Sequence, residues 1–139
     1  MLRAASIAVG VIGLAIATYL TIVHYAGGSP VCAIAHGCET VQKSDYSKLA
    51  GVPVALLGLI GYIGILGALI RDDERSRSVA AFLSLLGFGF SAWLTYTELA
   101  LINAICIWCV GSAICMTILA ALNVSRVLTV SEAELAPVR

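Results

Sequence analysis

The sequence predicts an all-α membrane protein, a four-transmembrane-helix bundle with a long exposed first loop. The chain has 139 residues, of which 60% are hydrophobic and 12% are charged. That charged share is about half of what a soluble domain carries. Mean hydropathy is +1.01, and a soluble chain of this size buries only about two-thirds of its surface, which would leave apolar surface in water. Four apolar runs also approach the ~20 residues that span a bilayer.

Each run is assigned to one helix of a single membrane domain, residues 1–139. We expect the four helices at residues 4–25, 52–70, 79–102 and 104–128, with a catalytic loop at residues 26–51. The first run is interpreted as a retained anchor, because its apolar stretch exceeds the roughly 7–15 residues of a signal peptide. Pro53 lies just inside the second helix start, where its missing N–H costs nothing.

The connections follow from the same runs. The charged stretch 71–77 predicts a water-exposed turn between the second and third helices. A single short turn near Asn103 makes the last two helices antiparallel neighbours. We expect the chain to fray from Ser125 onward.

Lys and Arg on short loops indicate orientation, because cytoplasmic loops carry an excess of them. Six arginines fall on one side, at positions Arg3, Arg71, Arg75, Arg77, Arg126 and Arg139. Only Lys43 and Lys48 fall on the other. We therefore expect a multi-pass protein of the cell membrane with both termini cytoplasmic and the first loop on the outer face. Eight basic and eight acidic residues cancel, which argues against nucleic acid as a partner.

Four of the five cysteines map to the outer side, where disulfides persist. Cys32 and Cys38 lie in the first loop, and Cys106 and Cys109 form a C-x-x-C at the start of the last helix. Residues at i and i+3 in a helical turn share one face. The helix N-terminus favours a thiolate, which would lower the pKa of Cys106 and activate it as a nucleophile. The fifth, Cys115, is interpreted as a packing residue.

Three interpretations of the four outer cysteines remain open on spacing alone. They could form two ordinary disulfides, or two dithiol pairs that exchange electrons. A zinc site that includes His36 is the third, although C-x5-C departs from the usual ligand spacing. A lipid-held bundle needs no disulfide to hold it together, which favours the exchange relay and predicts no metal.

The combination of features resembles the vitamin K epoxide reductase family, specifically its prokaryotic homologues. It consists of four apolar spans, a first-loop cysteine pair, a serine six residues after the second cysteine, Gly-x-Pro before the second helix and C-x-x-C at the last. The matching stretches are CAIAHGCETVQKSDYSKLAGVPVALLG, residues 32–58, and ELALINAICIWC, residues 98–109.

The resemblance implies a thiol oxidase whose bundle surrounds a quinone of the ubiquinone or menaquinone type. Cys32 would exchange with a thioredoxin-like dithiol protein. Cys38 would attack the Cys106–Cys109 disulfide and pair transiently with Cys106, and the freed Cys109 would face the quinone. Ser44 matches the family's loop serine. The chain ends at Arg139 without a thioredoxin-like domain, so we expect that partner to be a separate polypeptide.

Two further residues are candidates for the quinone site. Glu98 is an ionisable group near lipid depth; it is interpreted as a proton donor or as an interfacial carboxylate. Trp108 could pack on the quinone or belong to an interfacial belt. Ala113 stands where vertebrate members that reduce the epoxide place a tyrosine, which favours plain quinone reduction.

Two other functions remain possible. A DsbB-type oxidase also has four spans and two dithiol pairs, but its C-x-x-C lies in the first exposed loop rather than at the fourth helix. A non-catalytic membrane subunit held by disulfides is the alternative outside enzymes.

Overall fold

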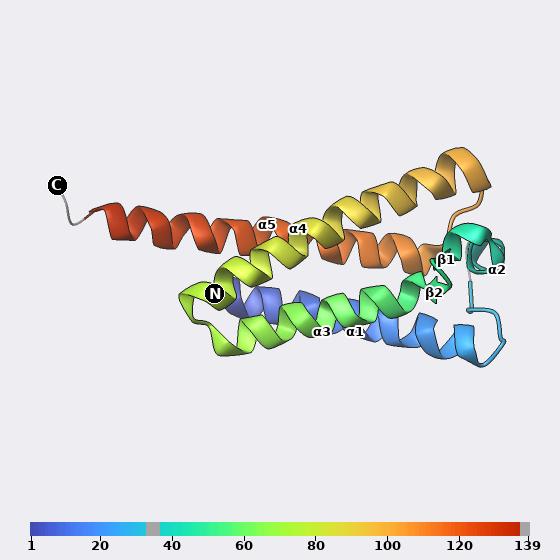
Figure 1. Ribbon diagram of the computed structural model, residues 1–139, viewed down its shortest axis with the longest axis horizontal. Helices are drawn as coiled ribbons and strands as arrows, with labels where there is room; N and C mark the ends of the chain where they lie inside the picture. The colour runs from blue at the N-terminus through green and yellow to red at the C-terminus, as the bar shows by residue number, and fades with distance from the viewer. Residues whose placement is uncertain (33–36, 137–139) are drawn as a thin grey trace.

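The computed structural model describes residues 1–32 and 37–136 and shows a bundle of long helices (Figure 1). The elements in chain order are α1 Leu2–Tyr25, α2 Gly37–Lys43, the 3-10 helix η1 Asp45–Ser47, β1 Lys48–Leu49, β2 Val52–Pro53, α3 Val54–Arg71, α4 Glu74–Thr97, the π-helix η2 Glu98–Ile102 and α5 Ile107–Leu135. The predicted all-α membrane bundle is confirmed.

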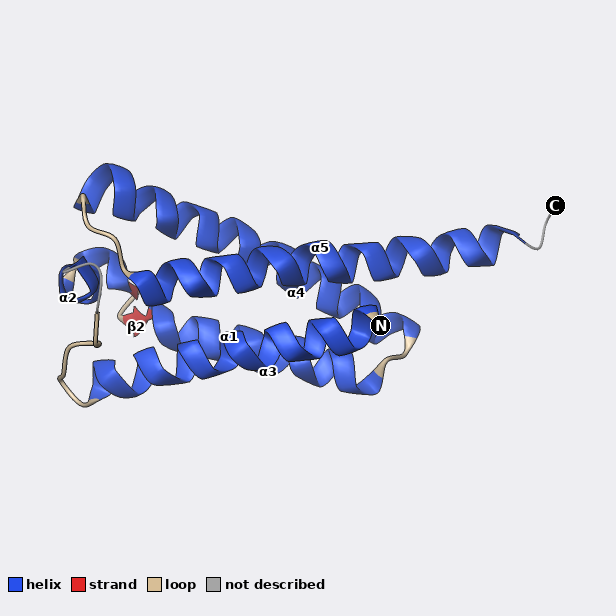
Figure 2. Ribbon diagram, turned by 180° about the vertical axis from the view of Figure 1, so that it is seen from behind, coloured by secondary structure: helices blue, strands red, loops and turns tan. Residues whose placement is uncertain are grey.

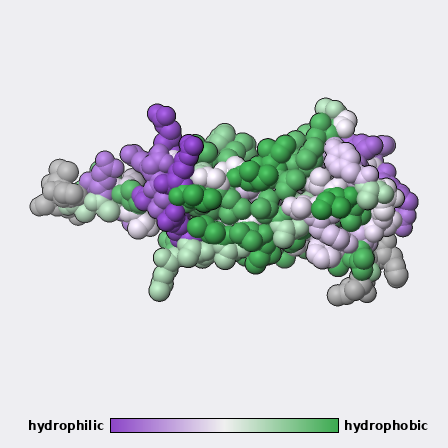
Figure 3. All heavy atoms as spheres, turned by 90° about the horizontal axis from the view of Figure 1, so that it is seen from below, coloured by the Kyte–Doolittle hydropathy of each residue, from purple (hydrophilic) through white to green (hydrophobic). Residues whose placement is uncertain are grey.

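Within the described residues, four helical segments are long and apolar enough to cross a membrane: Leu2–Tyr25, Val54–Arg71, Glu74–Ile102 and Ile107–Leu135. On the face shown in Figure 3, hydrophobic residues cover the middle of the bundle and hydrophilic residues gather toward both ends. Large apolar side chains such as Ile63 and Phe82 are more than half exposed, as expected for surface that faces lipid rather than water.

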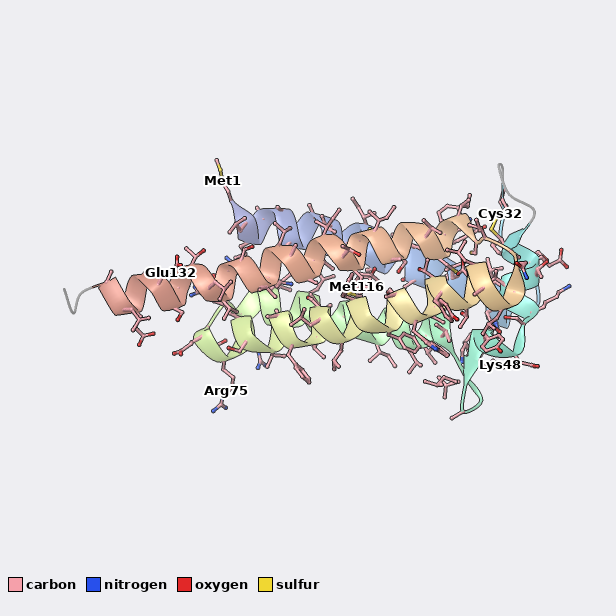
Figure 4. The ribbon with its side chains drawn as sticks, turned by 90° about the horizontal axis from the view of Figure 1, so that it is seen from above. Met1, Cys32, Lys48, Arg75, Met116 and Glu132 are labelled. Atoms are coloured by element: carbon pink, nitrogen blue, oxygen red, sulfur yellow. A yellow bond between two sulfur atoms is a disulfide. The ribbon has the colours of Figure 1, made fainter. Side chains whose placement is uncertain are left out.

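The two ends of the bundle differ in what they carry. Cys32 and Lys48 lie at one end, and Met1, Arg75 and Glu132 lie at the other (Figure 4). This agrees with the prediction that the first loop lies opposite the termini and the α3–α4 turn. At the terminal end the Asp72 carboxylate pairs with Arg77 at 3.0 Å, with Arg3 at 3.7 Å and with Arg126. One carboxylate thus links α1, α4 and α5.

The first loop is more structured than predicted. It contains α2, η1 and the two short antiparallel strands, drawn in red in Figure 2, in which Lys48 pairs with Pro53 and Leu49 with Val52. Ala50 and Gly51 both have positive φ, 52° and 84°, the backbone of a tight hairpin turn. The hairpin leads directly into α3, so Pro53 precedes the helix as its N-cap residue.

The third and fourth helices begin and end elsewhere than predicted. The turn predicted at 71–77 is only Asp72 and Asp73, because Asp72 closes α3 in the left-handed conformation and Asp73 is the N-cap residue of α4, accepting a hydrogen bond from Ser76. Consequently α4 starts at Glu74 rather than at residue 79. The chain did not fray at Ser125 either: α5 continues to Leu135, since residues 125–135 include strong helix formers and no Gly or Pro.

The last helix also starts later than residue 104. Asn103 is left-handed with φ of 54°, and Cys106 is extended with φ of −98° and ψ of 113°. A short non-helical segment therefore separates η2 from α5. Its backbone brings Cys106 to the N-cap position of α5. The sequence likewise predicted Cys106 at the start of the last helix.

Two glycines of α1 allow α1 and α3 to pack closely. A Cβ on Gly13 would lie 2.2 Å from the Tyr62 ring, and one on Gly10 would lie 2.8 Å from Leu66. These glycines let the two helix backbones approach. The core around them includes Tyr62, Ile65 and Leu119, each with no exposed surface, and Cys115 belongs to the same cluster, as its packing role predicts.

Candidate active site

The two cysteine pairs come together at one end of the bundle. Cys38 is 1% exposed and Cys106 is 0% exposed, and they pack in one buried cluster with Val41. Cys32 and Cys109 are partly buried against the same cluster. Cys32 and Cys38 form a disulfide with a Cα separation of 6.3 Å, whereas Cys106 and Cys109 are free thiols. The predicted convergence of the four sulfurs on one end is therefore present.

Gly37 explains how α2 reaches the start of α5. A Cβ built on Gly37 would lie 2.5 Å from the carbonyl oxygen of Ile105 and 2.6 Å from its nitrogen. No L side chain fits between these two backbones. The missing side chain lets α2 dock against residues 104–106 and sets Cys38 beside Cys106.

Cys106 occupies the position that favours a thiolate. The Cys109 side chain is its strongest partner, and hydrogen bonding from it holds the pKa of Cys106 below the usual range. Burial opposes this, and the backbone N–H groups of Cys109 and Trp108 add to the lowering. The sequence predicted the direction from the helix N-terminus, but the neighbouring thiol is the larger cause.

Glu98 lies buried behind the C-x-x-C. The residue is 4% exposed, and its Oε2 accepts the backbone N–H of Cys106 at 3.2 Å. Glu98 and Cys109 line the same cavity. The carboxyl therefore contacts the motif directly, and its role as a proton donor or as an interfacial carboxylate stays a prediction.

A cavity of about 160 Å³ opens beside Cys109 in the cysteine half of the bundle. Apolar cavities of roughly 150 Å³ hold a benzene molecule, so this one has room for a six-membered ring. Its lining is mostly apolar and comes from α1, α3, α4 and α5 together with the first loop. Ser44, Glu98, Cys109 and Ala113 are among the lining residues. Cys109 is thus the sulfur of the C-x-x-C that reaches the cavity.

Two hydroxyl groups lie deeper in the cavity wall. The Tyr62 hydroxyl donates to the Ser112 carbonyl oxygen at 2.9 Å and lies 3.0 Å from Ser112 Oγ. Neither residue was predicted from the sequence. A tyrosine in an otherwise apolar span needs a partner for its hydroxyl, and that requirement is the signal that points to it.

Two glycines of α3 contribute to the cavity. Gly58 and Gly61 line the cavity, and a Cβ on Gly61 would meet nothing within 4 Å. At Gly61 the missing side chain leaves open space rather than room for a neighbouring helix. Cavity volume here depends on the absence of side chains.

Trp108 points away from the cavity and is not among its lining residues. Its Nε1 donates to the Val31 carbonyl at 2.8 Å, and the Tyr19 hydroxyl accepts the Val31 N–H at 3.0 Å. The Tyr19 and Trp108 rings lie 4.8 Å apart between centroids. Together they hold the backbone of the residue that precedes Cys32, a contact that the sequence did not predict.

Ser44 lies half-buried in the cavity wall. Its hydroxyl donates to the Val41 carbonyl at 2.7 Å, so its oxygen lone pairs are free to accept. His36, the nitrogen ligand of the zinc alternative, lies outside the described residues. The Cys32–Cys38 disulfide also uses two of the four sulfurs that such a site needs as thiolates.

The site therefore combines a solvent-side disulfide, a buried thiol pair at a helix N-terminus and an apolar cavity beside the inner thiol. The family model described as "Vitamin K epoxide reductase family" matches residues 4–124, which is most of the chain. The protein belongs to the vitamin K epoxide reductase family.

Proposed function

We propose that this protein is a membrane thiol:quinone oxidoreductase that supports disulfide bond formation. It takes electrons from a separate thioredoxin-like dithiol protein through Cys32–Cys38, passes them to Cys106–Cys109 and reduces a quinone in the cavity. Family membership supports a membrane thiol–quinone oxidoreductase in general and decides against a DsbB-type ancestry. The observation that carries the proposal is the shared burial of Cys38 and Cys106, with Cys109 reaching the cavity.

Thiol exchange gives each cysteine a defined task. A thiolate of the partner attacks Cys32 Sγ, forms a mixed disulfide and releases Cys38 as a thiolate. Cys38 then attacks Cys106 Sγ, so that the Cys106–Cys109 bond breaks and Cys109 leaves as a thiolate. Burial of Cys38 against Cys106 supplies the proximity for the second exchange.

The cavity fits a quinone ring. Its volume of about 160 Å³ and its largely apolar wall suit an apolar six-membered ring. The hydroxyl groups of Ser44 and Tyr62 line it and would donate to ring oxygens by turning away from the carbonyl oxygens of Val41 and Ser112 that they bond now. The quinone would contribute a two-electron acceptor that dissolves in lipid. Ser44, Glu98 and Cys109 would hold it, while Trp108 would act on the Val31 backbone rather than on the ring.

The side chain at Ala113 supports plain quinone reduction over epoxide reduction. Ala113 lines the cavity at the place where vertebrate members that reduce the epoxide carry a tyrosine. A methyl group offers no hydroxyl to an epoxide oxygen. Ubiquinone or menaquinone types therefore suit the site better than a vitamin K epoxide.

Replacing Cys109 with Ala tests the proposal. Purified Cys109→Ala protein supplied with dithiothreitol should lose quinone reduction while remaining folded, because no thiolate faces the cavity. Cys115→Ala is the matched control, since Cys115 lies in the core on the same helix and outside the cavity lining. Wild-type turnover in the Cys109 variant would leave the non-catalytic subunit as the better interpretation.

The same variant should trap the exchange step. With Cys109 absent, Cys38 and Cys106 should form a stable mixed disulfide that mass spectrometry detects as one cross-linked peptide pair. A variant that also carries Cys38→Ala should show no such species. If the oxidised Cys109 variant contained only the Cys32–Cys38 linkage, the proposed order of exchange would be wrong.

The orientation proposed here puts both termini in the cytoplasm and the cysteine end on the outer face. A membrane-impermeant maleimide should label reduced Cys32 in intact cells, because this residue is only partly buried at that end. Labelling only after lysis would show the opposite orientation.

A further inference from the structure

Glu98 lines two hollows of the structure. Among the described residues, no other residue lines both. One is the cavity beside Cys109. The other is an open pocket at the cysteine end, lined in the described chain by Gly37, Thr40, Glu98, Leu99, Asn103, Ala104 and Ile105. Four of these residues, Thr40, Leu99, Asn103 and Ile105, are exposed. We call this hollow the outer pocket.

The proposed reaction moves protons as well as electrons, and the two follow different routes. Oxidising one dithiol breaks two S–H bonds, forms one S–S bond and releases two electrons and two protons. The exchange steps leave those protons in water at the exposed Cys32 side, whereas reducing a quinone takes up two protons inside the cavity. The sulfur chain carries the electrons, so the protons need a separate titratable group that contacts both water and the cavity.

We propose that Glu98 is the proton-transfer residue of this enzyme and that it draws protons from the outer pocket. Its carboxyl gives a proton to the acceptor oxygen in the cavity and is left as a carboxylate. Water in the outer pocket then protonates it again, and a second passage completes the two-proton uptake. This inference rests on the proposed function and identifies the side from which its protons come.

The contacts of Glu98 suit a group that titrates without moving far. Oε2 accepts the Cys106 N–H at 3.2 Å, which fixes the carboxyl in the wall between the two hollows. The titratable groups that face it are Cys106 and Cys109 from α5. From α2 the facing residues are Gly37 and Thr40, and Cys38 is held in its disulfide.

Glu98→Gln separates the proton role from the structural one. A glutamine carbonyl still accepts the Cys106 N–H, but an amide carries no transferable proton. Reduction of a short-chain ubiquinone by the variant should fall roughly 10²-fold, as expected for a lost general acid, and lose its dependence on pH. The Cys38–Cys106 exchange should keep the wild-type rate. Glu39→Gln, which removes an exposed carboxylate of α2 paired with Lys43, is the matched control.

A measurement without quinone tests the outer route directly. Infrared difference spectra of reduced minus oxidised protein should show a carboxyl band that is absent from Glu98→Gln and shifts in D2O. Thr40→Trp, which fills the outer pocket, should slow that shift. Lys43→Trp, one turn further along α2 and outside that pocket, should leave it unchanged.

The outcomes distinguish this inference from the proposed function. If wild-type protein reduces ubiquinone and Glu98→Gln matches its rate and pH profile, the proton role is wrong while the oxidoreductase stands. A D2O shift of the carboxyl band that is as fast in Thr40→Trp as in the wild type would overturn the outer route. If wild-type protein itself reduced no quinone, the proposed function would fail first.

Discussion

Gly37 and Ile105 lie in backbone contact, with so little space between them that a Cβ on Gly37 would be 2.5 Å from the Ile105 carbonyl oxygen. Through this contact the loop that carries the Cys32–Cys38 disulfide docks on the segment that leads into Cys106. Gly37 is therefore a docking residue, since only glycine permits this approach.

Gly37→Ala should therefore separate the two cysteine pairs without unfolding the bundle. The added methyl group pushes α2 away from Ile105, so the Cys38–Cys106 cross-link in a Cys109→Ala background should form at a small fraction of its normal yield. Gly28→Ala is the control, because a Cβ there meets nothing within 4 Å. Equal yields of the cross-link in the two glycine variants would contradict the docking role.

Much of the architecture followed from the sequence because lipid imposes simple rules. The number of membrane-spanning helices and the end that carries the cysteines both depend on run length and residue spacing. The turn at Asp72 and the start of α5 after residue 106 depend on local backbone conformations, such as the left-handed Asn103, which hydropathy does not encode.

The site was only partly predictable for a related reason. Ser44 and Cys109, which the family resemblance assigned to the site, line the cavity, and so does Glu98, a candidate because it is an ionisable group near lipid depth. Trp108 was a candidate for ring packing or an interfacial belt, and it contacts Val31; Tyr62 was not predicted. Side-chain direction on a helix depends on packing against its neighbours, and one sequence gives no information about which neighbour each face meets.

Gly61 sets the volume of the cavity, and filling it should weaken binding of the quinone. Gly61→Val adds side-chain atoms where the cavity now has open space, so we expect KM for a short-chain ubiquinone to rise about tenfold or more, the cost of roughly 1.4 kcal/mol of lost binding. Exchange between the cysteine pairs should be unaffected. Steady-state kinetics with varied quinone measures this effect.

Gly67→Val is the matched control for the cavity. Both glycines lie on α3 and both face open space, but Gly67 does not line the cavity. Its variant should keep the wild-type KM. A similar rise in KM in both variants would mean that valine perturbs α3 itself, and the volume argument would be withdrawn.

The Tyr19 and Trp108 contacts hold Val31 in place even though that residue is 71% exposed. Tyr19→Phe removes one of the two hydrogen bonds, which costs about 0.5–1.5 kcal/mol, and should loosen the segment that precedes Cys32. We expect the Cys32–Cys38 disulfide to react faster with dithiothreitol and less efficiently with a thioredoxin-like protein, because attack then lacks a fixed geometry. Tyr25→Phe, at the exposed end of α1, is the control and should change neither rate.

The ion pairs of Asp72, at the end of the bundle opposite the cysteines, should make the stability of the fold depend on pH. Hydrogen bonding from Arg77 is the largest of the influences that lower the pKa of Asp72, and Arg126 and Arg3 add to it. A carboxyl whose pKa is lower in the folded state stabilises the fold above its unfolded pKa of about 3.9. That contribution is lost as pH falls through the folded value.

Asp72→Asn removes the charge while keeping a residue type that tolerates the left-handed backbone at φ 54°. Since exposed ion pairs contribute about 0.2–1 kcal/mol each, we expect the variant to be destabilised by ~1 kcal/mol near neutral pH. The difference should shrink as pH falls below about 3.9 and vanish only below the lowered folded-state pKa of Asp72, because the wild-type carboxyl is protonated only there. Thermal unfolding in detergent across this range gives both values, with Asp45→Asn in the exposed loop as the control. A difference that stayed constant down to the lowest pH would show that the arginines act on Asp72 through packing rather than charge.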